Sequence, residues 1–490
     1  MDLWKFFTYS TEYLPTFTSG IFAFFFVIFY LIWSISQQKI AIRNAVLLVF
    51  SLYIYYKLAN EYVIVLIFYA LIDYFIGLQI YKEKKESLKK LLLYTSVLLN
   101  LSILFFFKYL GFAFQTWNVW TGQEIFIPQI IAPLGISFWI FRSLSYVLDV
   151  YNEIIDKPTT NYFHYLLYLS YFPTILAGPI ARAEPFLEQI KKNTQIDDRT
   201  MSLGYWLIIT GLIKKIVLSD PLGANFVQRI FENPGFYTGL ESLLAAFTYG
   251  FYLYYDFSGY TDMAIGMSLL IGIQIPQNFH EPFKAQSITE FWRRWHITLF
   301  QWFNDYVFTP LNFSLRRWGK SAAIFSMMIT FLLSGIWHGA NFTFIVWGLL
   351  HGIAISYEIA TQEFRKRLKN LWGNPFHTVF SIGITYTFLT FTFFFFNAPS
   401  LESTFKMFDR ILNDFHIELF PKWYKEYQLV AHVLLAGIIL HYLPTSWKKF
   451  FENQFLFLHW TLKIWLIVIA VILVYQFKTL GSIPFVYLQF

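Results

Sequence analysis

One histidine, His338, lies in a stretch that is otherwise apolar, small or aromatic. The stretch reads LLSGIWHGANFTF and covers residues 332–344, between apolar segments long enough to cross a membrane. Ionisable residues inside membrane segments are rare and usually functional. A neutral imidazole can accept a proton near neutral pH. We therefore predict that His338 is a general base, although a histidine bonded to a neighbouring helix would fit the same position.

Small and polar residues accompany His338. Gly335 and Gly339 are expected to let a substrate approach the backbone, and the amide of Asn341 is expected to supply a hydrogen bond. Trp337 precedes the histidine directly and is included as a supporting residue.

A polar and aromatic segment, SITEFWRRWHITLFQWFNDY, occupies residues 287–306. Ser287 and Glu290 form a capping-box pattern, which predicts that a helix begins at residue 288. Pro310 is expected to end this helix. The segment is too charged to face lipid, so we expect it to face protein or a water-filled cavity.

The same segment holds a second candidate for chemistry, His296. Arg293, Arg294 and Asp305 lie near it in the sequence. These residues are compatible with catalysis by His296 and also with a structural polar network. A third histidine within an apolar run, His351, is predicted to be structural.

Several cationic side chains are candidates for binding the phosphates of an anionic donor. They are Lys214 and Lys215 in GLIKKIVLSD, together with Arg293, Arg294, Arg316 and Arg317. Arginine and lysine both pair with phosphate. Extension of these side chains to the membrane surface explains them equally well.

The segment YYDFSGYTDMAIG, residues 254–266, places Asp256 and Asp262 in or beside an apolar run. Each carboxylate is a candidate for binding a cation or for orienting a basic partner. Tight polar packing around Gly259 is the alternative.

Composition places the chain in a membrane. Of its 490 residues, 57% are hydrophobic and only 14% are charged, which is typical of a polytopic membrane protein. The net charge of +7 comes from basic loops, which indicates cytoplasmic loops and not nucleic-acid binding. The chain has no cysteine, which excludes a catalytic thiol and thiolate metal sites.

Apolar runs predict an all-α protein with roughly 11 to 14 membrane segments, some of them re-entrant. Four of these predicted segments are residues 128–150, 163–180, 238–255 and 257–275. Residues 401–416 place apolar side chains on one helical face, which predicts an amphipathic helix lying in the membrane interface. We expect residues 1–490 to form a single transmembrane domain.

Other catalytic motifs are absent from the sequence. It contains no GxSxG elbow, no HExxH motif and no glycine-rich phosphate loop. We predict neither a bound metal nor a bound cofactor.

Taken together, the motifs resemble the membrane-bound O-acyltransferase (MBOAT) superfamily. The likeness is to its bacterial branch, which includes the alginate O-acetyltransferase membrane subunit, peptidoglycan O-acetyltransferases and the D-alanyl transfer protein. The matching stretches are residues 101–112, 133–151, 171–182, 254–266, 276–311, 332–352 and 484–490.

The resemblance implies a helical bundle with a central tunnel. It also implies that His338 is the catalytic histidine and that His296 is the second functional position of this branch. One departure is visible: Asn304 stands where the family usually has a basic residue before the aspartate, here Asp305. The role that the basic side chain has in the family is therefore not expected of Asn304.

The function implied is transfer of an acetyl group from a cytoplasmic thioester, acetyl-CoA, across the bacterial inner membrane. The acceptor would be an extracytoplasmic polysaccharide, either an exopolysaccharide such as alginate or peptidoglycan. A separate extracytoplasmic acyltransferase partner with a Ser-His-Asp-type (SGNH) site would complete the transfer.

Two alternatives remain. One is D-alanyl transfer to teichoic acids. The other is a non-enzymatic transporter or export channel, which would predict two related halves with paired broken helices.

Overall fold

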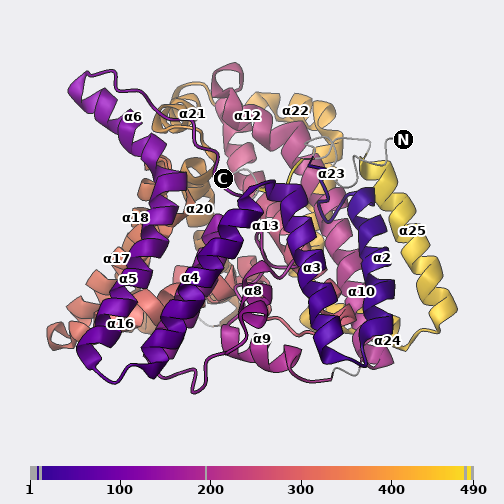
Figure 1. Cartoon of the computed structure of the whole chain (residues 1–490). Coiled ribbons are helices and arrows are strands. Elements are labelled where there is room, and N and C mark those ends of the chain that lie inside the picture. The colour runs from indigo at the N-terminus through magenta and orange to yellow at the C-terminus, as the bar shows by residue number, and fades with distance from the viewer. Residues whose placement is uncertain (1–7, 10–13, 194–195, 373, 479–482, 487–490) are drawn as a thin grey trace. The chain divides into compact units, whose positions relative to one another are not determined.

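The computed structural model describes residues 8–9, 14–193, 196–372, 374–478 and 483–486. Every regular element in these ranges is a helix (Figure 1). Within the described residues, eight helical segments are long and apolar enough to cross a membrane, or nine if the bent pair α23 (Gln428–Tyr442) and α24 (Thr445–Phe457) forms one span. The prediction of an all-α polytopic membrane protein is confirmed, and the predicted number of spans is too high.

Four of the predicted segments account for most of the excess. Residues 128–150 become helical only at α7 (Ile136–Tyr151), after the left-handed Gly135. Residues 163–180 yield only the nine-residue α8 (Tyr162–Ser170) and turns. The two runs between 238 and 275 form a single helix, α13 (Gly239–Leu270).

Gly259 does not break α13, because its role is close packing. A Cβ atom at this position would lie 2.7 Å from the carbonyl oxygen of Gly211. The absence of a side chain therefore lets α13 approach α10 (Asp198–Leu212) closely, which is a common use of small residues between membrane helices.

The chain divides into two compact units. The first comprises Met1–Ile208 and Thr261–Pro276, and the second comprises Ile209–Tyr260 and Gln277–Phe490. The division falls inside α10 and α13. The expectation of a single transmembrane domain stays a prediction.

Consecutive long helices build the first unit. Ser19 begins α2 by accepting a hydrogen bond from the Phe22 amide at 3.1 Å. Helices α2 to α5 lie side by side in chain order (Figure 1). The helices of this unit are α2 (Gly20–Ser36), α3 (Ile40–Ala59), α4 (Tyr62–Lys82), α5 (Glu86–Leu104), α6 (Leu110–Thr121), α7, α8 and α9 (Ala183–Ile190).

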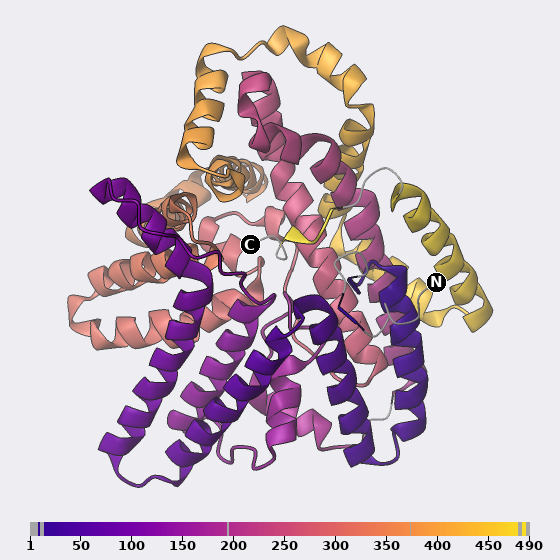
Figure 2. The ribbon, with the colours of Figure 1, turned by 45° about the horizontal axis from the view of Figure 1, so that its top comes forward.

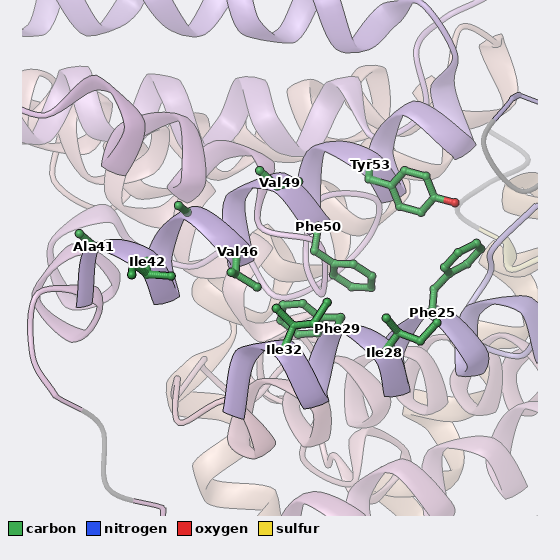
Figure 3. A pocket seen from close by; sticks show the side chains of 11 residues that line it. Phe25, Ile28, Phe29, Ile32, Ala41, Ile42, Val46, Val49, Phe50 and Tyr53 are labelled. Carbon is green, nitrogen blue, oxygen red and sulfur yellow. The ribbon is translucent and has the colours of Figure 1, made fainter. Parts of the chain in front are cut away.

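An apolar groove of about 590 Å³ separates part of α2 from α3 (Figure 3). Phe29 and Phe50 stack across it with ring centroids 4.2 Å apart. Its walls are the side chains of Phe25, Ile28, Phe29, Ile32, Ala41, Ile42, Ala45, Val46, Val49, Phe50 and Tyr53. None of these residues offers a base or a nucleophile suited to acyl transfer, so the groove is not the candidate active site.

A buried carboxylate joins three helices of the first unit. Asp73 on α4 is fully buried and accepts hydrogen bonds from Ser96 at 2.7 Å and from Asn100 at 2.8 Å. Ser143 on α7 donates a further bond to it. A carboxylate within a spanning helix is thus satisfied entirely by protein donors.

One span, Asp198–Glu232, begins with α10 and is divided between the two units, and the second unit contains the other remaining spans. Their helices are α17 (Lys320–His338), α18 (Phe342–Ala360), α20 (Asn374–Asn397), α23, α24 and α25 (Trp460–Lys478). In Figure 2 an orange arch formed by α21 (Leu401–Asn413) and α22 (Phe420–Glu426) joins α20 to α23. The shorter helices include α11 (Asp220–Leu222), α12 (Gln228–Glu232) and α19 (Gln362–Trp372).

The predicted amphipathic helix exists as α21 but ends at Asn413, three residues before its predicted end. One apolar side chain, Phe408, packs on Phe391 and Phe394 of α20. Phe405 and Leu412 are 60% and 80% exposed, as expected for side chains that face lipid. The location of α21 in the membrane interface stays a prediction.

Glycines bring α17 and α18 into contact. A Cβ at Gly335 would lie 2.4 Å from the Phe344 carbonyl oxygen, and one at Gly348 would lie 2.4 Å from the Phe331 carbonyl oxygen. The structure thus corrects the expectation that Gly335 opens the backbone to substrate, because the neighbouring helix fills that space.

We predict that Gly335→Ala destabilises the protein by about 1–3 kcal/mol, the usual effect of an oversized side chain in a packed interior. Gly383→Ala in α20 is the matched control, because a Cβ there meets no atom within 4 Å. Thermal unfolding in detergent would measure both variants. Equal midpoints for the two variants would contradict the packing role of Gly335.

Candidate active site

His338 is the last residue of α17, at the joint with α18. Gly339 leaves the helical conformation with φ −171° and ψ 157°, and Asn341 begins α18 as its N-cap. The side chain of His338 is buried, with only 5% of its surface exposed. The chain therefore delivers an imidazole to the protein interior where one spanning helix ends and the next begins.

Aromatic rings surround His338. The centroid of its ring lies 4.9 Å from Trp337, 4.9 Å from Trp347 on α18 and 5.1 Å from Phe396 on α20. The ring of Phe344 lies against Gly339, where a Cβ would come within 2.2 Å of it. Gly339 therefore accommodates a ring of the protein, and the expectation that it makes room for substrate is wrong.

The amide of Asn341 is engaged in structural bonds. Its Oδ1 accepts from the Thr343 amide at 3.1 Å, and its Nδ2 donates to the Pro399 carbonyl at 2.8 Å. Asn341 therefore fixes the start of α18 and ties it to the segment that follows α20.

The segment that carries His296 is helical but broken. Ser287 accepts a hydrogen bond from the Glu290 amide at 3.0 Å, and α14 (Ile288–Trp292) begins at residue 288 as predicted. The helix stops before His296 and resumes as α15 (Ile297–Phe303). Pro310 does not end it, because a π-helical turn at Asn304–Phe308 leads into α16 (Thr309–Ser314).

His296 adopts a left-handed backbone conformation, with φ 42° and ψ 52°. This conformation is uncommon for a residue with a side chain and is often found at functional sites. The side chain is fully buried, and its ring lies edge-on to Phe257 with centroids 4.8 Å apart.

Burial lowers the pKa of the His296 imidazole to about 3. His296 lies outside the helices that are apolar enough to span a membrane. Its ring is therefore neutral at physiological pH, since desolvation disfavours the imidazolium.

Asn278 holds the turn at His296, and the sequence analysis missed it. Its backbone carbonyl accepts from the Ile297 amide at 2.9 Å. Its buried Oδ1 lies 3.2 Å from His296 Nδ1 and accepts from the Thr298 amide at 3.1 Å and the Thr298 hydroxyl at 2.9 Å. An asparagine in an irregular segment gives no periodic signal, so only the fold reveals this role.

The arginines beside His296 have different surroundings. Arg293 is exposed, whereas Arg294 is paired with Glu290 at 2.7 Å. Asp305 is exposed and accepts a hydrogen bond from Asn304 at 3.2 Å. Of these three predicted residues, Arg293 is the one whose charge is best placed to meet an incoming ligand.

Lys215 is a buried structural cation, contrary to the expectation that it attracts a donor phosphate. Its ammonium group pairs with Asp220 at 2.7 Å and also with Asp256. Asp256 accepts from the Val486 amide at 2.8 Å as well. Asp256 thus orients a basic partner, as one of the two predictions for it stated. The neighbouring Lys214 is half-buried.

His351 is structural, as predicted. Its Nδ1 accepts from Trp292 at 3.2 Å, and its Nε2 lies 3.2 Å from the Thr392 hydroxyl. A further histidine, His441, is also buried, and the rings of Tyr254 and Phe283 enclose it with centroids 5.0 and 5.2 Å away.

A small cavity of about 10 Å³ lies between the helices that carry the two candidate histidines. Ser334, one turn before His338, and Leu299, one turn after His296, both line it. The space is close to that of one water molecule. The central tunnel stays a prediction.

Several spanning helices with histidines buried among them define a multi-pass membrane protein with a polar site in its interior. Residues 53–398 match the membrane-bound O-acyltransferase family, MBOAT, and the chain belongs to this family. It is therefore an acyltransferase, and the hypothesis of a non-enzymatic transporter is set aside.

Three relatives indicate the range of the family. The chain is 33% identical to a peptidoglycan O-acetyltransferase of Helicobacter pylori, over 73% of this chain and 71% of the relative. It is 38% identical to a probable alginate O-acetylase of Pseudomonas putida, over 70% of each chain. A teichoic acid D-alanyltransferase of Bacillus subtilis is 31% identical over 55% of this chain and 70% of its own length.

We predict that Lys215→Met destabilises the protein by about 3–5 kcal/mol, because two buried carboxylates lose their cation. Lys214→Met is the matched control, since the half-buried Lys214 lies next to it in the chain. Thermal unfolding in detergent would compare the two variants. A Lys215→Met protein as stable as the control would refute the structural role of Lys215.

Proposed function

We propose that this enzyme moves an acetyl group from acetyl-CoA across the bacterial inner membrane, where it serves for O-acetylation of an extracytoplasmic polysaccharide. The observation that carries the proposal is the position of His338, buried at the joint between two spanning helices. A base at that place can act on a substrate inside the protein, where the substrate is shielded from the water on both sides of the membrane.

The acyl-transfer step requires one proton transfer to His338 and one proton transfer from it. The imidazole of His338 takes the proton of the acceptor hydroxyl as its oxygen attacks the thioester carbonyl. When the C–S bond breaks, the departing thiolate takes that proton and leaves as the thiol. His338 thereby returns to its starting state. His296 is the second polar group proposed to contact the reactants.

The comparisons favour acetyl over D-alanyl transfer. The two acetylating relatives described above align with 70–73% of this chain at 33–38% identity. The relative named as a D-alanyltransferase aligns with a smaller share, 55%, at 31%. The acceptor is proposed to be peptidoglycan or an exopolysaccharide such as alginate, which are the substrates in the relatives' names.

A second protein is proposed to complete the transfer outside the membrane. The family resemblance supports a partner with an extracytoplasmic Ser-His-Asp-type acyltransferase site. Arg293 and Lys214 are proposed to meet the phosphates of acetyl-CoA at the cytoplasmic face. Both side chains are at least partly exposed, and cations with that exposure can pair with phosphate.

Base-releasable acetate in purified wall and exopolysaccharide fractions tests the proposal. We expect deletion of the gene to lower acetate in one fraction and the wild-type gene to restore it. His338→Ala, made at equal protein level, should fail to restore it, because loss of a general base lowers rates by about 10²–10⁴.

His432→Ala is the matched control, since His432 is exposed and bonded only to Tyr424. Full restoration by His338→Ala would refute the role of His338. Acetate that is unchanged by the deletion, with loss of ester-linked D-alanine instead, would replace acetyl by D-alanyl transfer.

A further inference from the structure

Asn278 has an orientation that can be determined from its neighbours. The two ends of an asparagine amide are distinguished by the groups that they contact. One end lies 3.1 Å from the Thr298 backbone N–H, which is always a donor. That end must therefore be the oxygen, Oδ1, because an NH2 group there would oppose a second donor.

The same oxygen lies 3.2 Å from Nδ1 of His296. An amide oxygen can only accept, so Nδ1 must carry a hydrogen atom. A neutral imidazole has a single N–H, and the other ring nitrogen, Nε2, then has the lone pair. The backbone of Thr298 thus sets the tautomer of His296 through Asn278.

We propose that Asn278 is a positioning residue that locks His296 as the Nδ1–H tautomer, so that His296 acts on substrate as a hydrogen-bond acceptor through Nε2. This inference rests on the proposed function, in which His296 contacts the reactants. It assigns His296 a role: Nε2 receives a hydroxyl or amide hydrogen of a substrate. Because Nε2 carries no hydrogen in this tautomer, it does not donate to the oxyanion that forms on the thioester carbonyl.

The fold supports this arrangement at the backbone as well. Asn278 also accepts from the Ile297 amide through its carbonyl oxygen, at 2.9 Å, and His280 donates its amide to the Arg294 carbonyl at 2.8 Å. These bonds hold residues 278–280 against the turn that contains His296. The left-handed backbone of His296 is thereby fixed together with the direction of its ring.

Nitrogen NMR of the protein labelled with ¹⁵N-histidine tests the tautomer without reference to activity. The signals of His296 are those that disappear in His296→Gln. We expect a protonated Nδ1 and an unprotonated Nε2 in the wild-type protein. A protonated Nε2 in the wild-type protein would overturn the inference, even if His296 proves essential for acyl transfer.

Steady-state kinetics test the consequence for catalysis. Asn278→Leu removes the acceptor and should lower kcat by about 10-fold to 100-fold, because a misdirected imidazole loses its hydrogen bond to the substrate. Asn278→Asp keeps the acceptor and should retain more activity than Asn278→Leu. Asn278→Leu combined with His296→Gln should be no slower than His296→Gln alone, because the two residues act as a unit.

Asn225→Leu is the control, since Asn225 is half-buried and not hydrogen-bonded to a histidine. Additive losses in the double variant would show that Asn278 acts apart from His296 and would overturn the inference. A fully active His296→Gln would instead remove His296 from the proposed function, whatever its tautomer. The two failures are therefore distinguishable.

Discussion

Every polar group within the spanning helices of this protein must be satisfied without bulk water, and this constraint shapes the rest of the structure. Lys215 is balanced by Asp220 and Asp256, and Asp73 by three side-chain donors. His351 is held through both ring nitrogens. These groups are accounted for by packing and hydrogen bonding. The catalytic role is therefore assigned to other residues, His338 at the end of a helix and His296 in a turn.

The position of His338 depends on the close approach of α17 and α18. Gly335 and Gly348 remove the side chains that would separate the two helices, and Gly339 accommodates the ring of Phe344. The same contact that stabilises the helix pair thus fixes the direction from which the imidazole enters the interior. His296 is positioned differently. It lies in the turn between α14 and α15, and hydrogen bonds to Asn278 hold this turn in place. The position of His338 therefore depends on helix packing, and the position of His296 depends on a hydrogen-bonded turn.

Composition and apolar runs predicted the membrane class and the helical fold correctly, and the capping box of Ser287 and Glu290 predicted the start of α14, because these features depend on local sequence. The number of spans could not be predicted, since it depends on where helices bend or stop, as at Gly135. The roles of Lys215 and Asn278 also lay beyond sequence reasoning. Asp256 is 41 residues from Lys215 and Thr298 is 20 residues from Asn278, and only the tertiary fold brings these pairs together.

The most direct test of the chemistry is thiol release from acetyl-CoA by purified protein in lipid nanodiscs, with and without an oligosaccharide acceptor. We expect the wild-type protein to release CoA thiol in the presence of acceptor. His338→Ala, with the same unfolding midpoint as the wild type, should release thiol no faster than empty nanodiscs. Equal rates of release from the wild type and His338→Ala would contradict the assignment of His338 as the base.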